Sequence, residues 1–315
     1  MRAGLCALIL CLAAAPALAQ REAGAPQPLP EPLVRIGAGP ASAADLVRCL
    51  DGRNATIVSA HRGGPMPGFP ENALETFAHT LSRMPALIEM DIRRTADDRL
   101  VLMHDEDVAR TSTGSGRVGE LTADQLRPFE LEDHTGRRPR AGFRIPELEA
   151  TLAWARDRGI VVLDLKRGVD AGAVAAAVRR AGAPERTVMI VDPEEAARIA
   201  RTEPAISYSL SLRSVRDLED AVRAGVPEDR ILAFTGIGPE APDLWAELDR
   251  RGIPVIHGTL WDGDREIAAT NDDARYARLA DRGVDVLVTD RHFEAHWALE
   301  ARQDTAAALR ACVEK

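Results

Sequence analysis

Short apolar runs alternate with longer amphipathic stretches along most of the chain. Nine runs rich in Val, Ile and Leu have the length and composition of β-strands, at residues 56–59, 87–92, 100–103, 160–165, 188–191, 206–210, 231–234, 254–257 and 284–289. Seven stretches between them repeat apolar residues every three to four positions, as a helix with one buried face does. These predicted helices span residues 72–83, 145–158, 171–181, 193–202, 214–224, 242–251 and 273–281.

Alternating strands and helices, with strands that are apolar on both faces, are typical of a parallel sheet covered by helices. We therefore predict an α/β fold, a (β/α)8 TIM barrel with a small insertion after the third strand. Nine candidate strands are one more than this barrel needs, and residues 231–234 are the weakest of them. An open doubly wound sheet is the alternative, although the turn at residues 61–64 does not have the glycine spacing of a dinucleotide site.

The chain begins with a segment of a different kind. Residues 1–19 combine Arg2, an apolar core and a small-x-small site before Gln20, which predicts a cleaved secretory signal peptide. A lipoprotein anchor at Cys11 is the alternative. We therefore expect a secreted or periplasmic protein without stable membrane insertion.

The remaining residues divide into a linker and one domain. Residues 20–44 are rich in proline and have no apolar periodicity, which predicts a linker. Residues 45–315 then form the barrel domain. Within it, residues 106–144 form the predicted insertion and contain only one short helical patch, at residues 122–129.

Composition narrows the class of protein. The 315 residues are 45% hydrophobic and 28% charged, as in a soluble globular protein with a large core. A formal charge of -9 argues against a nucleic-acid binder that relies on phosphate contacts. Without the signal peptide the cysteines are Cys49 and Cys312, and exported cysteines commonly form disulfides. A Cys49–Cys312 disulfide would join the two ends of the domain, and two unpaired thiols are the alternative.

Acidic residues stand near the ends of two predicted strands. Period two places Glu89 and Asp91 on one face of the second strand, and Asp164 lies near the end of the fourth. The carboxyl ends of barrel strands meet at one rim, so we expect these three carboxylates to meet there. Grouped carboxylates repel one another unless a cation lies between them, and oxygen ligands suit Mg²⁺ or Ca²⁺. The pattern predicts one bound divalent cation, with a solvated strand edge as the alternative.

Two histidines and two cations stand at the same predicted rim. Because imidazoles titrate near neutral pH, His61 and His104 suit a general acid and a general base, and purely structural histidines are the alternative. Arg62 and Lys166 add fixed positive charge, which suits a phosphate group in a small-molecule substrate. The motifs contain no Ser or Cys nucleophile paired with a base, so we expect a substrate hydroxyl or a water to attack.

The order and spacing of these residues resemble those of the glycerophosphodiester phosphodiesterases. The similarity covers about residues 56–291 and rests on His61-Arg62-Gly63-Gly64, Pro70-Glu71-Asn72, Ile88-Glu89-Met90-Asp91-Ile92, His104-Asp105, Gly114-Ser115-Gly116, Leu163-Asp164-Leu165-Lys166 and Thr289-Asp290. It implies a metal on the three carboxylates, the two histidines as acid and base, and Arg62 and Lys166 as phosphate contacts. It also implies that a substrate hydroxyl attacks phosphorus, and that water opens the resulting cyclic phosphate to glycerol 3-phosphate.

Two positions differ from the family's pattern. Asp164 stands where the family usually has Glu, and Gly258 stands where it usually has Trp at the glycerol pocket. The resemblance therefore implies hydrolysis of glycerophosphodiesters and leaves the alcohol headgroup open. A phospholipase-type phosphodiesterase on the same barrel is one alternative. An exported organophosphate-binding protein without turnover is another, although both histidines are present.

Overall fold

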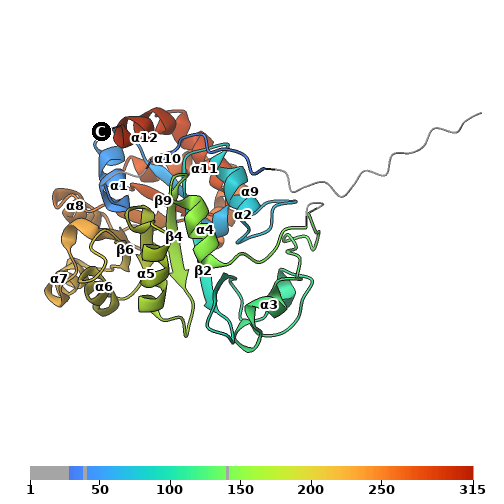
Figure 1. Cartoon of the computed structure of the whole chain (residues 1–315). Coiled ribbons are helices and arrows are strands. Elements are labelled where there is room, and N and C mark those ends of the chain that lie inside the picture. The colour runs from blue at the N-terminus through green and yellow to red at the C-terminus, as the bar shows by residue number, and fades with distance from the viewer. Residues whose placement is uncertain (1–27, 38–40, 140–141, 315) are drawn as a thin grey trace, which may run out of the picture.

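The computed structural model describes residues 28–37, 41–139 and 142–314 of the chain, which form a barrel surrounded by helices (Figure 1). The predicted signal peptide at residues 1–19 lies outside the described residues. None of the helices among the described residues is long and apolar enough to cross a membrane.

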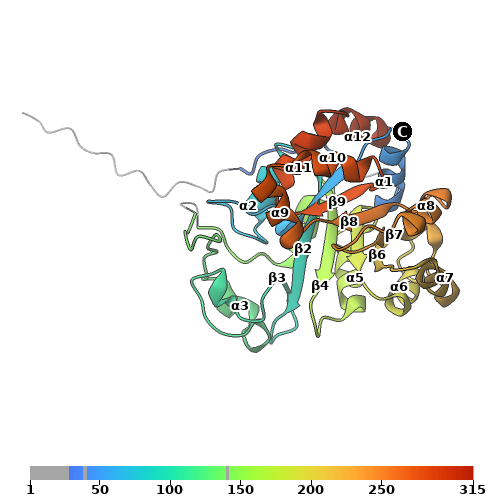
Figure 2. The ribbon, with the colours of Figure 1, turned by 180° about the vertical axis from the view of Figure 1, so that it is seen from behind.

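Eight parallel strands close into a barrel, because β1 pairs with β2 on one side and with β9 on the other (Figure 2). The barrel strands are β1 (Ile57–Ala60), β2 (Ala86–Arg94), β4 (Ile160–Leu165), β5 (Thr187–Ile190), β6 (Ser207–Ser211), β7 (Ile231–Phe234), β8 (Val255–Gly258) and β9 (Val286–Thr289). This confirms the predicted (β/α)8 barrel. Residues 231–234, the weakest candidate in the sequence, form a regular barrel strand.

The surplus strand is the third in chain order. β3 (Leu100–Leu102) pairs antiparallel with the end of β2, so that Leu102 lies opposite Ile92 and Leu100 opposite Arg94. β2 has nine residues, and its last residues extend beyond the barrel, where β3 runs back along them toward the rim. The expectation that all the strands run parallel is therefore wrong for β3, yet its carboxyl end still reaches the rim formed by the carboxyl ends of the barrel strands.

The insertion follows β3 and contains α3 (Ala123–Leu126), to one side of the barrel in Figure 1. Its apolar residues, which include Val108, Leu131 and Phe143, pack in one small cluster together with Ala73 and with Val101 of β3. A hydrogen bond from the backbone N–H of Gly68 to Asp133 (2.6 Å) ties it to the loop after β1. The insertion thus packs as a compact unit beside the rim.

Each predicted helical stretch contains a helix that packs outside the barrel. These helices are α2 (Leu74–Leu81), α4 (Leu148–Ala155), α5 (Ala171–Arg180), α6 (Pro193–Ala200), α7 (Val215–Ala224), α8 (Pro242–Arg250) and α10 (Ala274–Ala280). The structure adds α1 (Ala43–Asp51), α9 (Asp262–Thr270), α11 (His292–Glu300) and α12 (Thr305–Val313).

Helices α1 and α12 lie together at the end of the barrel where the strands begin (Figure 1). Leu46 and Leu50 of α1 belong to one apolar cluster with Val162 and Val188 inside the barrel. Residues 34 and 36, in the stretch that the sequence assigns to a linker, are buried in the same cluster.

The predicted disulfide joins these two helices. Cys49 of α1 and Cys312 of α12 are bonded, and their Cα atoms are 5.9 Å apart. The bridge connects the two ends of the domain, on the side of the barrel opposite the strand ends that carry the polar residues.

Candidate active site

A cavity of about 340 Å³ opens at the carboxyl ends of the barrel strands. Its charged lining comes from one half of the rim, between β1 and β4: His61, Arg62, Glu89, His104, Asp164 and Lys166. The other half, from β5 to β9, is mainly apolar and includes Ile190, Phe234, Ile256, Leu260, Trp261 and Val288. Six of the seven predicted site residues therefore line one cavity, and the seventh, Asp91, is buried beside Glu89 and Asp164.

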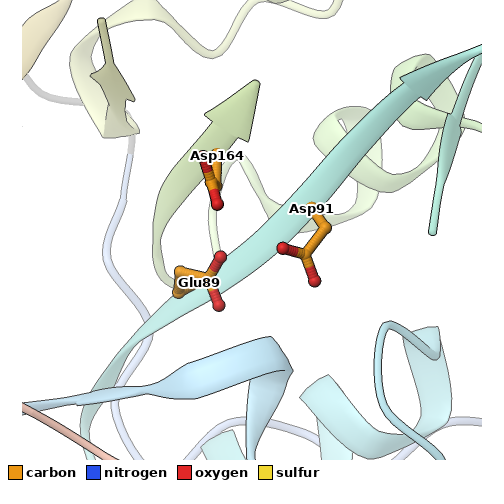
Figure 3. A group of neighbouring side chains, drawn as sticks. All are labelled: Glu89, Asp91 and Asp164. Carbon is orange, nitrogen blue, oxygen red and sulfur yellow. The ribbon is translucent and has the colours of Figure 1, made fainter. Parts of the chain in front are cut away.

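The three predicted metal ligands come together (Figure 3). In the parallel pairing of β2 with β4, Asp91 lies opposite Asp164, and Glu89 precedes Asp91 by two residues on the same face. One carboxylate oxygen from each of the three lies within 4.8 Å of the others. This set of oxygen donors fits a hard divalent cation.

Burial makes this cluster electrostatically costly without a cation. Glu89 is 5% exposed, and burial together with the neighbouring Asp91 raises the pKa of Glu89 to about 8. Burial also acts to raise the pKa of Asp91, but Lys166 and Asn72 more than offset it and lower that pKa. The Lys166 Nζ lies 2.6 Å from both Asp91 Oδ1 and Asp164 Oδ2, so positive charge is already held at the cluster.

His61 follows β1 and is held by a carboxylate from the neighbouring strand. β1 and β9 pair so that Ala60 lies opposite Thr289, which brings the next residues, His61 and Asp290, together. His61 Nδ1 lies 2.7 Å from Asp290 Oδ1. Burial lowers the pKa of His61, but the bond to Asp290 and the charge of Glu89 outweigh it, so the pKa is raised. The His61 ring is therefore oriented through Nδ1, which leaves Nε2 for chemistry.

His104 is held in the same way. It follows β3, and its Nδ1 lies 2.6 Å from Oδ1 of the adjacent Asp105. The guanidinium of Arg93 donates two hydrogen bonds to the His104 carbonyl oxygen, at 2.9 and 2.7 Å. The cavity is thus lined by two imidazoles whose Nδ1 atoms each contact a carboxylate.

Arg62 lies between the histidine and the acidic cluster. Its backbone has φ +52°, and its N–H donates to Glu89 Oε2 at 2.6 Å. Its side chain donates to both carboxylate oxygens of Glu71 at 3.0 Å, and Glu71 also accepts from Arg110. The next residue must be glycine, since a Cβ at Gly63 would lie 2.1 Å from the Phe77 ring. The His-Arg-Gly-Gly sequence is therefore a tight turn that fixes Arg62 at the rim.

The comparisons with known proteins agree with this geometry. A sequence profile of the glycerophosphoryl diester phosphodiesterase family matches residues 61–174, the stretch that holds all seven predicted site residues. A crystal structure of a glycerophosphoryl diester phosphodiesterase from Parabacteroides distasonis superposes with a TM-score of 0.76 and 28% identity, over 85% of this chain and 94% of that one. The chain is therefore similar to this family in sequence over residues 61–174 and in fold over most of its length.

Curated phosphodiesterases of the family are similar over a shorter stretch. The glycerophosphodiester phosphodiesterase of Caldanaerobacter subterraneus is 33% identical over 115 residues, 36% of this chain and 46% of the relative. Mouse glycerophosphodiester phosphodiesterase 1 is 34% identical over 131 residues, 41% of this chain and 39% of the relative. The chain thus matches less than half the length of these two relatives.

Several residues around this site are not assigned a role by the sequence. Asp105 and Asp290 orient the two histidines, and Arg110 links Asp105 to Glu71 through side-chain hydrogen bonds. Each of the two aspartates directly follows a residue that the sequence places at a strand end, so its position in the sequence could have identified it as a site residue. Asp264 is different, because it lies in α9, which the periodicity does not predict.

A larger cavity, of about 550 Å³, lies on the outside of the barrel beside β3 and α5. Its charged side chains pair with each other: Arg99 with Glu147, and Arg180 with Glu149 at 3.2 Å. Neither the histidines nor the acidic cluster lines it, so the rim cavity is the candidate active site.

Proposed function

We propose that this protein hydrolyses glycerophosphodiesters to glycerol 3-phosphate and an alcohol. The observation that supports this most is the arrangement of two imidazoles, each bound to a carboxylate through Nδ1, around one cavity that is lined by Lys166 and bordered by a cluster of three carboxylates. The activity is also the one for which the curated relatives are named.

In the proposed reaction, His61 and His104 act as the general acid and the general base. One imidazole takes the proton of the attacking substrate hydroxyl as its oxygen bonds to phosphorus. The other donates a proton to the leaving alcohol oxygen as its bond to phosphorus breaks. In the second step water attacks the cyclic phosphate, the two histidines exchange roles, and the ring opens to glycerol 3-phosphate.

Glu89, Asp91 and Asp164 would hold one divalent cation, Mg²⁺ or Ca²⁺, beside the phosphate. Their oxygens lie close enough together, and the raised pKa of Glu89 indicates that a cation would relieve their mutual repulsion. Such an ion neutralises charge on a phosphate oxygen. In this proposal Lys166 and the Arg62 guanidinium contact the remaining phosphate oxygens, and their present partners, Asp91, Asp164 and Glu71, keep both side chains at the rim.

We propose that the protein works in the periplasm or outside the cell. The Cys49–Cys312 disulfide supports this, because disulfides persist mainly in oxidising compartments. The test is fractionation of cells that express the full chain with a C-terminal tag. Recovery of the protein with its N-terminus still at Met1 in the cytoplasmic fraction would contradict the proposal.

Release of glycerol 3-phosphate from glycerophosphocholine is the measurement that tests the reaction. Product formation that EDTA abolishes and added Mg²⁺ or Ca²⁺ restores is the expected result, and Asp91→Asn should not be restored by either ion at ordinary concentrations. Product from lysophospholipid micelles but not from soluble diesters would favour the phospholipase-type activity. Binding of glycerophosphocholine without any product would favour an organophosphate-binding protein.

A further inference from the structure

Asp264, in the first turn of α9, has a buried carboxylate that receives hydrogen bonds from four residues in three segments of the chain. The side chain is 4% exposed. It accepts from the hydroxyl of Thr259 (2.6 Å), the hydroxyl of Tyr276 (2.9 Å), the hydroxyl of Thr289 (2.8 and 2.9 Å) and the backbone N–H of Asp290 (2.8 Å). The carboxylate therefore fastens the end of β9 to β8, α9 and α10.

A buried carboxylate is expensive to keep unless its oxygens are fully hydrogen-bonded. Within the part of the chain that the structure describes, no Lys or Arg forms an ion pair with Asp264. Its oxygens instead accept hydrogen bonds from three hydroxyl groups and one backbone N–H. Two of the four donor residues, Thr289 and Asp290, are consecutive, so the bonds converge on the point where β9 ends.

The end of β9 lies next to His61, which Asp290 contacts directly. Asp290 donates its backbone N–H to Asp264 Oδ2, while its own carboxylate Oδ1 lies 2.7 Å from His61 Nδ1. Asp264 Oδ2 and His61 are thus joined through a single residue. Thr289 also accepts the backbone N–H of Arg291 at 3.0 Å, which fixes the chain on the far side of Asp290.

We propose that Asp264 is a positioning residue that holds Asp290 in place and thereby sets the orientation of His61. The inference rests on the proposed function, in which His61 is one of the two proton-transfer groups. Asp264 does not line the cavity, so it acts through its neighbours, and of these Asp290 is the one that contacts His61.

The residue just before α9, which carries Asp264, has a backbone conformation consistent with this role. Trp261 has φ +59° and ψ -106°, an uncommon combination for a bulky side chain. Such conformations persist where surrounding contacts over-determine them, often at functional sites. The backbone N–H of Trp261 also helps to lower the pKa of the Asp290 carboxylate.

A double-mutant cycle on kcat tests the proposal. Asp264→Asn should lower kcat about 10-fold with little change in KM, as the loss of a residue that supports a catalytic group does. Asp290→Asn should lower kcat by about 100-fold or more, because it removes the direct partner of His61. If Asp264 acts only through Asp290, the double variant should be no slower than Asp290→Asn. Multiplied losses in the double variant would overturn the proposal.

A spectroscopic measurement keeps the test independent of turnover. In ¹H–¹⁵N spectra of imidazole-labelled protein, the Nδ1–H signal of His61 should be sharp in the wild type and broadened or lost in Asp264→Asn. If the wild type shows no turnover but this change occurs, the proposed function fails and the positioning role stands. Wild-type turnover with an unchanged signal and an unchanged kcat in Asp264→Asn would overturn the positioning role alone.

Two further variants separate positioning from folding. Tyr276→Phe removes one donor to Asp264 and keeps the ring, so it should give a smaller loss of kcat and a smaller change in the His61 signal even if Asp264→Asn does not fold. Asp285→Asn alters a partly buried carboxylate just before β9, at the opposite end of that strand, and should leave both readouts at wild-type values. A wild-type kcat and signal in Tyr276→Phe, or a loss in Asp285→Asn equal to that in Asp264→Asn, would overturn the proposal.

Discussion

At the scale of single residues, hydrogen bonds to neighbouring carboxylates hold the histidine side chains of the candidate site in place. The two histidines have carboxylate partners, Asp290 and Asp105, which follow different strands and are far apart in the sequence. Such partners fix the tautomer and the direction of the ring, so that both Nε2 atoms are free at the same time. In the proposed reaction, both rings are therefore already oriented for proton transfer before substrate binds.

Removal of either imidazole should stop most of the turnover. We expect His61→Ala and His104→Ala each to lower kcat by about 100-fold or more, since general acid and base catalysis commonly contributes that much. Neither side chain is part of the apolar core, so the midpoint of thermal unfolding should change by only a few degrees. His134→Ala, in an exposed loop, is the control and should keep wild-type kcat. Near wild-type rates in both rim variants would exclude the proposed roles.

Trp261 should contribute to substrate binding through its ring. The side chain lines the cavity and is 53% exposed, and its positive φ suits glycine better than tryptophan. Trp261→Gly therefore removes the ring without straining the loop. We expect KM for glycerophosphocholine to rise about 10-fold with kcat within about twofold of wild type, which is the effect of losing one aromatic contact.

The matched control is Trp297→Ala, because Trp297 is 64% exposed but lies on α11 and does not line the cavity. Its KM should stay at the wild-type value. An unchanged KM in Trp261→Gly would show that the bound alcohol does not reach this side of the rim.

At the scale of elements, the periodicity of the sequence predicts where strands and helices lie, but it does not predict which strands pair or in which direction. The barrel strands and seven helices follow from local patterns, and the strand ends at Glu89, Asp91 and Asp164 follow from period two. The antiparallel direction of β3 does not, because a three-residue strand has no pattern that reports its partner. The direction of β3 depends on the last residues of β2, which extend beyond the barrel and pair antiparallel with it.

Gly258 illustrates a second limit. The sequence places it where the family has tryptophan, but its neighbours come from another loop. A Cβ at Gly258 would lie 2.6 Å from the side chain of Ile237, so this position has no room for a larger residue unless Ile237 moves. Tertiary contacts of this kind are not encoded by spacing along the chain.

The beginning of β9 should make stability depend on pH. Burial raises the pKa of Asp285 to about 7, and the neighbouring Asp51 adds to this, although a hydrogen bond from the Val255 N–H opposes it. The folded state thus keeps a proton between about pH 4 and pH 7 that the unfolded chain releases. Its contribution to stability is present below about pH 4 and is lost as the pH rises to 7.

Asp285→Asn cannot lose this proton. Between pH 5 and pH 8 we expect its free energy of unfolding to rise relative to that of the wild type by about 1–2 kcal/mol. Chemical denaturation at both pH values measures the difference, with Asp281→Asn, which is exposed and paired with Arg302, as the control. A difference between variant and wild type that does not change with pH would show that Asp285 does not bind the proton.

At the scale of the whole molecule, the disulfide that stabilises the barrel and the residues of the candidate site lie at opposite ends of the barrel. The rim at the carboxyl ends carries the histidines and the acidic cluster, whereas the opposite end is closed by α1 and α12 and joined by the disulfide. Changes at the disulfide should therefore affect unfolding and leave the active site intact. The histidines and the acidic cluster are at the opposite end of the strands from this closure.

Removal of the disulfide provides the test of this separation. Cys49→Ser/Cys312→Ser should lower the free energy of unfolding by about 2–4 kcal/mol, because the bridge spans 263 residues and restricts the unfolded chain. Guanidinium unfolding of variant and wild type, each with and without reductant, measures this, and reductant should lower the stability of the wild type alone. At 25 °C, well below the unfolding transition, kcat should equal that of the wild type. A loss of kcat under conditions where the variant is fully folded would mean that the two ends of the barrel are coupled, and equal unfolding midpoints would mean that the bridge does not restrict the unfolded chain.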